Sequence, residues 1–308
     1  NIGVALWNMG RYEEDIAKQE QALGIYQTIK GTEREQAGCH MNIGIALWNM
    51  GRYEEAIARQ EQALRIYQTK QLISSTRKEQ AGCYVNIGVA LWNMDRYEEA
   101  IAKQEQALGI YQTIKGTERE QAGCYKNIGV ALINIGRYEE GIAKQEQALK
   151  IYQTIKGAER QQADCYVNVG IALRNMGRYE EAIAKYEQAL RIFQTIEGTE
   201  REQADCHKNI GVALDNMGRY EEAIARQEQA LKIYRTIKGA ERDQAACYVS
   251  IGVALWNMDR YEEAIAKYEQ ALKIYQTKQL ISSTRKEQAD CYKNIGVALI
   301  NIGRYEEG

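Results

Sequence analysis

One stretch of 23 residues recurs along the whole chain and limits the folds that the chain can adopt. Its clearest copy runs from Asn42 to Leu64, and the copies follow one another at a spacing of 41 or 44 residues. The eight copies, the last of them partial, start at Asn1, Asn42, Asn86, Asn127, Asn168, Asn209, Ser250 and Asn294. Repeats of this size stack, so that each packs mainly on its neighbours. We therefore expect a single array over residues 1–308 rather than two independent globular domains.

Each repeat has the pattern of two amphipathic helices. The first helix that leads into the Asn42 copy is expected to begin at Glu33 and to stop at Gly51 in a left-handed turn. Asp95 and Asp259 replace that glycine in two other repeats. The buried stripe of the first helix is predicted to contain Ala37, His40, Ile43, Gly44 and Leu47. The stripe of the second helix is predicted to contain Tyr53, Ala56, Ile57, Gln60, Ala63, Leu64 and Tyr67.

Small residues stand where these two stripes face each other, at Gly44, Ala56 and Ala63. They allow the two helices to approach closely as an antiparallel pair. A single pair buries too little surface to offset the entropy of the chain, whereas stacked pairs share a continuous core. The sequence contains no proline, which suits an almost wholly helical chain. The predicted fold class is all-α, a solenoid of antiparallel helix pairs.

A capping box is predicted at the start of most first helices. Thr32 and Glu35 have its form, in which the hydroxyl accepts from a backbone amide and the glutamate reaches back. The same pair recurs as Thr76 with Glu79, Thr117 with Glu120, Thr199 with Glu202 and Thr284 with Glu287. Ala158 and Ala240 break the pattern, and we expect those two helix starts to be weaker by roughly 1 kcal/mol.

The charges of the chain nearly cancel, with 40 Lys and Arg residues against 42 Asp and Glu residues. The uniform basic field of a protein that binds phosphate backbones is missing, so we expect no nucleic-acid partner. No apolar run is long enough for a membrane span, and no signal peptide is visible, which favours a cytoplasmic location. The chain starts in mid-repeat without methionine. We interpret it as a window of a longer array, so the location stays open if that array belongs to an extracellular assembly.

The residues that usually carry chemistry are sparse. One cysteine occurs per repeat at the same position, and we interpret the seven as small buried helix residues rather than as redox or metal sites. The two histidines, His40 and His207, occupy a core position. No phosphate-binding loop or cluster with metal-ligand spacing occurs, so we predict a protein that is not an enzyme and needs no cofactor or metal.

The run from Asn42 to Leu64 resembles the tetratricopeptide repeat, and the similarity covers seven units and the partial eighth. The family's signature sites are matched by Gly44, Leu47, Tyr53, Ala56, Ala63 and an aromatic position filled by Tyr84, Tyr125, Tyr166, Tyr248 and Tyr292. These units are longer than usual and lack the family's proline. They are more similar to the long-helix variety found in kinesin light chains and bacterial multi-repeat proteins. The resemblance implies a right-handed superhelix whose concave groove is lined by first helices and binds peptides.

Two asparagines recur on the face of the first helices that the resemblance assigns to this groove. One series contains Asn8, Asn49, Asn93, Asn134, Asn175, Asn216, Asn257 and Asn301. The other contains Asn42, Asn86, Asn127, Asn168, Asn209 and Asn294, with Ser250 in the seventh repeat. An asparagine amide both donates and accepts, so such a ladder can pair with the backbone of an extended peptide. The alternative is that these amides cap helices or bridge adjacent repeats.

Tryptophan and lysine recur on the same face. Trp7, Trp48, Trp92 and Trp256 share one position, which holds isoleucine, arginine or aspartate in the other repeats. Exposed tryptophans would anchor an apolar side chain of a partner, although neighbouring repeats could instead bury them. A related position holds Lys126, Lys208 and Lys293 and is otherwise methionine or valine. The dicarboxylate clamp of some family members is not expected, because its further asparagine is replaced by isoleucine or valine.

We therefore predict a protein interaction scaffold that binds an extended peptide segment in the groove. The alternative is a structural role, in which near-identical repeats stack end to end with further copies of the same chain and form a filament.

Overall fold

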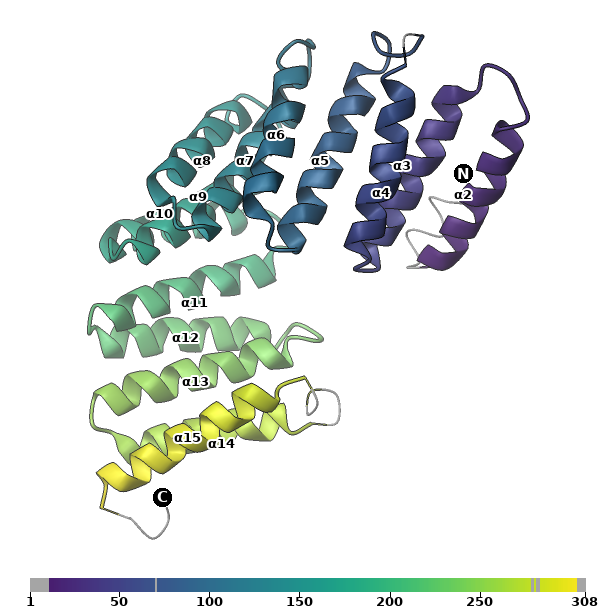
Figure 1. Ribbon diagram of the computed structural model, residues 1–308. Helices are drawn as coiled ribbons and strands as arrows, with labels where there is room; N and C mark the ends of the chain where they lie inside the picture. The colour runs from purple at the N-terminus through teal and green to yellow at the C-terminus, as the bar shows by residue number, and fades with distance from the viewer. Residues whose placement is uncertain (1–10, 70, 278–279, 281–282, 304–308) are drawn as a thin grey trace. The chain divides into compact units, whose positions relative to one another are not determined.

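The computed structural model describes residues 11–69, 71–277, 280 and 283–303. Within these residues every regular element is an α-helix, which confirms the all-α class (Figure 1). The helices are α2 (Tyr12–Tyr26), α3 (Glu33–Asn49), α4 (Tyr53–Tyr67), α5 (Arg77–Asn93), α6 (Tyr97–Tyr111), α7 (Glu118–Asn134), α8 (Tyr138–Tyr152), α9 (Glu159–Asn175), α10 (Tyr179–Phe193), α11 (Glu200–Asn216), α12 (Tyr220–Tyr234), α13 (Glu241–Asn257), α14 (Tyr261–Tyr275) and α15 (Arg285–Asn301). The odd-numbered helices are the first helices of the repeats, and the even-numbered helices are the second helices.

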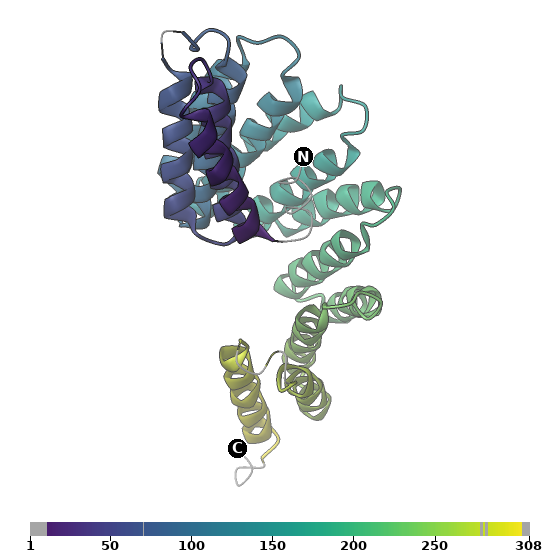
Figure 2. The same cartoon turned by 90° about the vertical axis from the view of Figure 1, so that its right-hand side faces the viewer.

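The chain divides into two compact units, residues 1–156 and residues 157–308. Within each unit, a first helix packs against the second helix that follows it, and this second helix packs against the next first helix. Within each unit the pairs lie side by side in sequence order, as both views show (Figure 1 and Figure 2). The predicted stacking of antiparallel helix pairs is therefore confirmed in each unit.

The turns between paired helices have the left-handed residue that the sequence predicts. Gly51 has φ +74°, and the amide of Arg52 donates to the carbonyl of Leu47 at 2.9 Å. Asp95 and Asp259 occupy the same turn with φ +57° and +59°. Because a left-handed residue ends a helix, the second helix turns back onto the first after only three residues.

The two helices of a pair meet closely at Gly44. A Cβ atom there would lie 2.6 Å from Nε2 of Gln60 and 3.1 Å from the carbonyl oxygen of Ala56. Gln60 is 2% exposed, and its Nε2 donates to the carbonyl of Met41 at 2.9 Å. The glutamine therefore joins the second helix to the backbone of the first. In two repeats the rings of Tyr186 and Tyr268 fill the same place.

The predicted capping boxes are wrong. None of the helix-start threonines caps its own helix through its side chain. The hydroxyl of Thr117 instead donates backwards, to the carbonyls of Tyr111 at 2.7 Å and Ile114 at 2.8 Å. Thr32, Thr76, Thr199 and Thr284 make the equivalent bonds. The reason is tertiary: packing brings the C-terminal carbonyls of the preceding helix to a hydroxyl that the sequence marks only as helix-starting.

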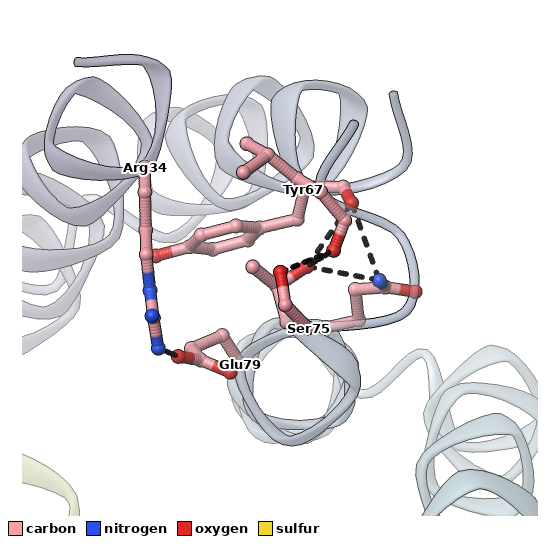
Figure 3. Close-up of polar contacts among 7 residues, drawn as sticks. Arg34, Tyr67, Ser75 and Glu79 are labelled. Carbon is pink, nitrogen blue, oxygen red and sulfur yellow. Dashed lines mark hydrogen bonds and ion pairs between the residues drawn. The ribbon is translucent and has the colours of Figure 1, made fainter. Parts of the chain in front are cut away.

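Four of the five glutamates assigned to the capping boxes, all except Glu35, take part in ion pairs between successive first helices. Glu79 pairs with Arg34 of the preceding repeat beside the ring of Tyr67, as Figure 3 shows. Lys78 pairs with Glu120 at 2.6 Å in the same unit. In the second unit the pairs are Arg160–Glu202, Arg201–Asp243 and Arg242–Glu287. Each is partly exposed, so solvent screening leaves each pair only a small contribution to stability.

A second contact between paired helices joins a basic side chain of the second helix to a ring of the first helix, and it has two forms. In four repeats a lysine lies 5.6–6.0 Å from the centre of a tyrosine ring, as Lys103 does at Tyr84. In the two histidine repeats the lysine is replaced by arginine: Arg59 Nη1 lies 3.5 Å from Nδ1 of His40. Its Nη2 donates to Glu20 of the preceding repeat at 2.8 Å. Because arginine can only donate, this contact favours the neutral tautomer of the ring, in which Nδ1 accepts.

The role of Thr117 is tested by replacing it with aspartate, which is at least as good an N-cap acceptor as threonine. We expect Thr117→Asp to lower the free energy of unfolding by about 2 kcal/mol, because a buried carboxylate would face two carbonyls without a donor. Thr113→Asp, at an exposed hydroxyl, is the matched control. Unchanged urea unfolding of Thr117→Asp would show that the residue is a cap after all.

The close approach at Gly44 is tested by Gly44→Ala with Gly38→Ala as its control. We expect Gly44→Ala to lower the free energy of unfolding by roughly 1–3 kcal/mol, because the added methyl group overpacks the helix pair. A Cβ at Gly38 would meet nothing within 4 Å. Gly38→Ala should therefore be neutral or stabilising, since alanine favours helix. Equal urea midpoints for the two variants would contradict the contact.

The histidine repeats should lose stability on acidification. Burial, followed by the charge of a nearby arginine, lowers the pKa of both His40 and His207. The unfolded chain therefore binds protons first, and stability falls as the pH drops below the ordinary histidine pKa of about 6.5. A variant with His40→Tyr, Arg59→Lys, His207→Tyr and Arg226→Lys should lose this dependence. Identical pH profiles of the melting temperature for both proteins would refute this assignment.

Candidate binding groove

A cavity in the first unit brings together residues of the predicted groove. Its volume is about 260 Å³. The lining residues are Gly44, Ile45, Trp48 and Asn49 of α3, Ala56 and Gln60 of α4, and Asn86 and Val89 of α5. The cavity thus lies between two successive first helices, with the second helix between them as its floor. Three of the predicted site residues, Trp48, Asn49 and Asn86, share it.

The sequence creates this cavity through residue size. Gly44 and Ala56 form the floor of the cavity, and these small residues leave space where the helices meet. Ile45, Trp48 and Val89 form its apolar walls. Two polar atoms of the lining residues are buried without a hydrogen-bond partner among the described residues, namely Oε1 of Gln60 and Nε1 of Trp48. The walls are therefore mainly apolar, and the amides of Asn49 and Asn86 add groups that can both donate and accept.

Four of the asparagines that end the first helices have a partner in their own helix. The amide of Asn49 donates to the carbonyl of Ile45 at 2.8 Å. Asn93, Asn134 and Asn216 make the same bond to the residue four positions earlier, at 2.8–3.0 Å. This bond uses one of the two N–H groups and fixes the orientation of the amide. Asn175 is exposed, and Asn8 lies outside the described residues.

The second asparagine series makes contacts between repeats at two places. The amide of Asn42 donates to Oε1 of Gln19 on α2 at 3.5 Å. Asn209 accepts from Arg174 at 3.4 Å. Asn86, Asn127 and Asn168 are partly buried. Part of the hydrogen-bonding capacity of both series is thus used within the protein.

The three tryptophans that the structure describes differ in exposure although they share one position in the repeat. Trp48 and Trp256 are partly buried against the core, beside Leu47 and Leu255. Trp92 is 37% exposed. Trp7 lies outside the described residues. Both alternatives that the sequence leaves open therefore occur, in different repeats.

The predicted lysines also differ. Lys208 pairs with Asp205 at 2.9 Å and lies 5.7 Å from the centre of the Tyr234 ring. Burial, followed by the hydrogen bond to Asp205, raises the pKa of Tyr234. Lys126 is partly buried, and Lys293 is exposed. Lys208 is therefore already engaged in a contact within its own helix pair.

Sequence reasoning placed Gln60 in the buried stripe but missed its role. Gln104, Gln145 and Gln227 repeat its bond to the backbone of the first helix at 2.8–3.1 Å. A polar residue that recurs at a buried stripe position is the signal that could have revealed this bond.

Chemistry at the cysteines is disfavoured by burial. All seven are buried. Burial raises the pKa of Cys83 and of Cys124 to about 12, so both are neutral thiols at neutral pH. Among the described residues no group of three His, Cys, Asp or Glu side chains could hold a metal ion. Those residues also include no helix with the length and apolar character needed to span a membrane.

The sequence matches two tetratricopeptide repeat models. One matches residues 1–69, 79–154, 122–195, 161–236 and 200–277, and the other matches residues 41–113. A comparison with curated proteins found no match.

Solved structures of similar fold include the apo form of RapI, with a TM-score of 0.68 at 16% identity. That alignment covers 97% of this chain and 87% of RapI. The apo form of the quorum sensor NprR from B. thuringiensis has a TM-score of 0.71 at 17% identity, over 96% of this chain and 78% of NprR. A putative kinesin light chain from Podospora anserina, with nearly identical repeats, has a TM-score of 0.56 at 18% identity. That alignment covers 66% of this chain and 98% of the kinesin light chain.

The family models match most of the chain, and the helix pairs, the close glycine contact and the left-handed turns agree with them. The chain belongs to the tetratricopeptide repeat family.

Proposed function

We propose that this chain is a non-catalytic scaffold whose first unit binds an extended peptide segment along the first helices α3 and α5. The observation that carries the proposal is the cavity of about 260 Å³ between these helices. Its volume lies near the lower end of ligand pockets, so it suits one amino-acid side chain rather than a large ligand.

The asparagines support the proposal because they keep hydrogen-bonding groups that their contacts within the protein do not use. The bond from Asn49 to Ile45 holds the amide in place and leaves one N–H and the carbonyl oxygen of that amide unused by the bond. Asn86 lines the same cavity from the next repeat. Two amides on neighbouring helices can therefore pair with the backbone of one extended segment while its side chain enters the apolar cavity.

Two of the solved structures of similar fold have names that state a role. One of them is a quorum sensor and another is an aspartyl phosphate phosphatase from Bacillus subtilis. Identities of 17% and 12% relate this chain to them in fold alone. The end-to-end assembly that the sequence leaves as an alternative stays a prediction.

The proposal predicts different effects for the amides and for the tryptophan. The double variant Asn49→Ala, Asn86→Ala should bind all of a set of short labelled peptides about tenfold or more weakly, because two hydrogen bonds to the backbone are lost. Trp48→Ile, the residue found at Ile133, should instead change which central peptide residue is preferred. Fluorescence anisotropy measures both effects.

Gln106→Ala removes an exposed amide from α6 and is the matched control, which should bind like the original chain. Sedimentation under the same conditions checks that the binding species is a single chain. Unchanged affinities in the double asparagine variant, or no peptide bound by the original chain, would contradict the proposal.

A further inference from the structure

Two of the turns between paired helices carry a side chain where the others have glycine. Asp95 and Asp259 adopt φ +57° and +59°, whereas Gly51, Gly136 and Gly177 have φ between +74° and +80°. Aspartate tolerates this backbone at a cost that glycine does not incur. The turn itself therefore does not require a carboxylate. Both aspartates occur in repeats that have tryptophan on the first helix, three residues earlier.

The first of these turns has three side chains in one small cluster. The centres of the Trp92 and Tyr97 rings lie 6.4 Å apart, edge to face, with an angle of 69° between their planes. The hydroxyl of Tyr97 donates to Oδ1 of Asp95 at 2.5 Å. Trp92 is 37% exposed, and Asp95 is exposed. An aromatic surface and a carboxylate are thus presented to solvent together.

The second turn has the same construction. The rings of Trp256 and Tyr261 lie 6.5 Å apart at 64°, and the hydroxyl of Tyr261 donates to Oδ1 of Asp259 at 2.6 Å. Trp256 is more buried than Trp92. The arrangement of tryptophan, tyrosine and aspartate is therefore found once in each unit.

The charge of these aspartates is not neutralised by any ion pair within the described part of the chain. The adjacent basic residue, Arg96, is held by two hydrogen bonds of 2.6 Å to Glu99. Arg260 is held in the same way by Glu263. The nearest basic residues in the sequence are therefore already committed to other carboxylates.

We propose that each of these two clusters is a binding site for a lysine or arginine side chain of a protein partner. A cation attracted to the aromatic rings would also have a carboxylate beside it, and these two attractions act together. These two binding sites do not depend on peptide binding at the Trp48 cavity, because neither Trp92 nor the turn residues line that cavity.

The test uses Nα-acetyl-arginine methylamide and its neutral isostere, Nα-acetyl-citrulline methylamide, as probes. The indole N–H signal of Trp92 is followed by NMR during titration of the whole chain at low salt, and Trp92→Ile assigns that signal. We expect the arginine probe to bind about three- to tenfold more tightly than the citrulline probe. Equal affinity for the two probes would overturn the proposal.

Asp95→Asn is the decisive variant. Asparagine tolerates the left-handed turn and can still accept from Tyr97, so the fold is kept while the charge is removed. We expect this variant to lose the preference for arginine at Trp92 while Trp256 keeps it, and Asp259→Asn to show the reverse. A preference that persists at Trp92 in Asp95→Asn would show that the carboxylate plays no part and would overturn the proposal.

Discussion

The contact between Gly44 and Gln60 is the interaction on which the helix pair depends. The glycine lets the second helix come so close that a methyl group would touch the glutamine amide at 2.6 Å. At this distance Gln60 reaches the carbonyl of Met41 and joins the two helices by a buried hydrogen bond. Burial makes this bond costly to lose, because an unpaired amide would remain in the core. The same contact shapes the floor of the groove cavity, so stability and the candidate site share one set of residues.

The links between repeats are of a different kind. Threonine hydroxyls such as that of Thr117 bind the end of the preceding helix, and ion pairs such as Lys78–Glu120 join successive first helices. Four of the five threonines are buried, whereas the ion pairs are partly exposed and weak. Stacking therefore rests mainly on the apolar cores and on buried donors, and it leaves the first-helix face partly exposed.

Much of the fold follows from local patterns. The helix periodicity, the left-handed Gly51 and the small residues Gly44 and Ala56 each have one dominant structural meaning, and the structure confirms them. Thr117 shows that a local pattern can have two structural meanings. A threonine before a helix can accept as a cap or donate to a neighbouring chain segment, and only packing decides which bond forms. The site was less predictable for a similar reason: Trp48 and Trp92 share a repeat position, yet their neighbours give them different exposure.

The most direct test of the account follows the side-chain amide of Gln60 by NMR during titration with a peptide that binds the chain. If the contact between Gly44 and Gln60 also forms the floor of the cavity, a bound peptide should shift the Gln60 amide signal. The dissociation constant from this shift should equal the one that anisotropy gives. The amide of Gln106, exposed on α6, should not move. An unmoved Gln60 signal at saturating peptide would contradict the claim that one contact supports both the fold and the site.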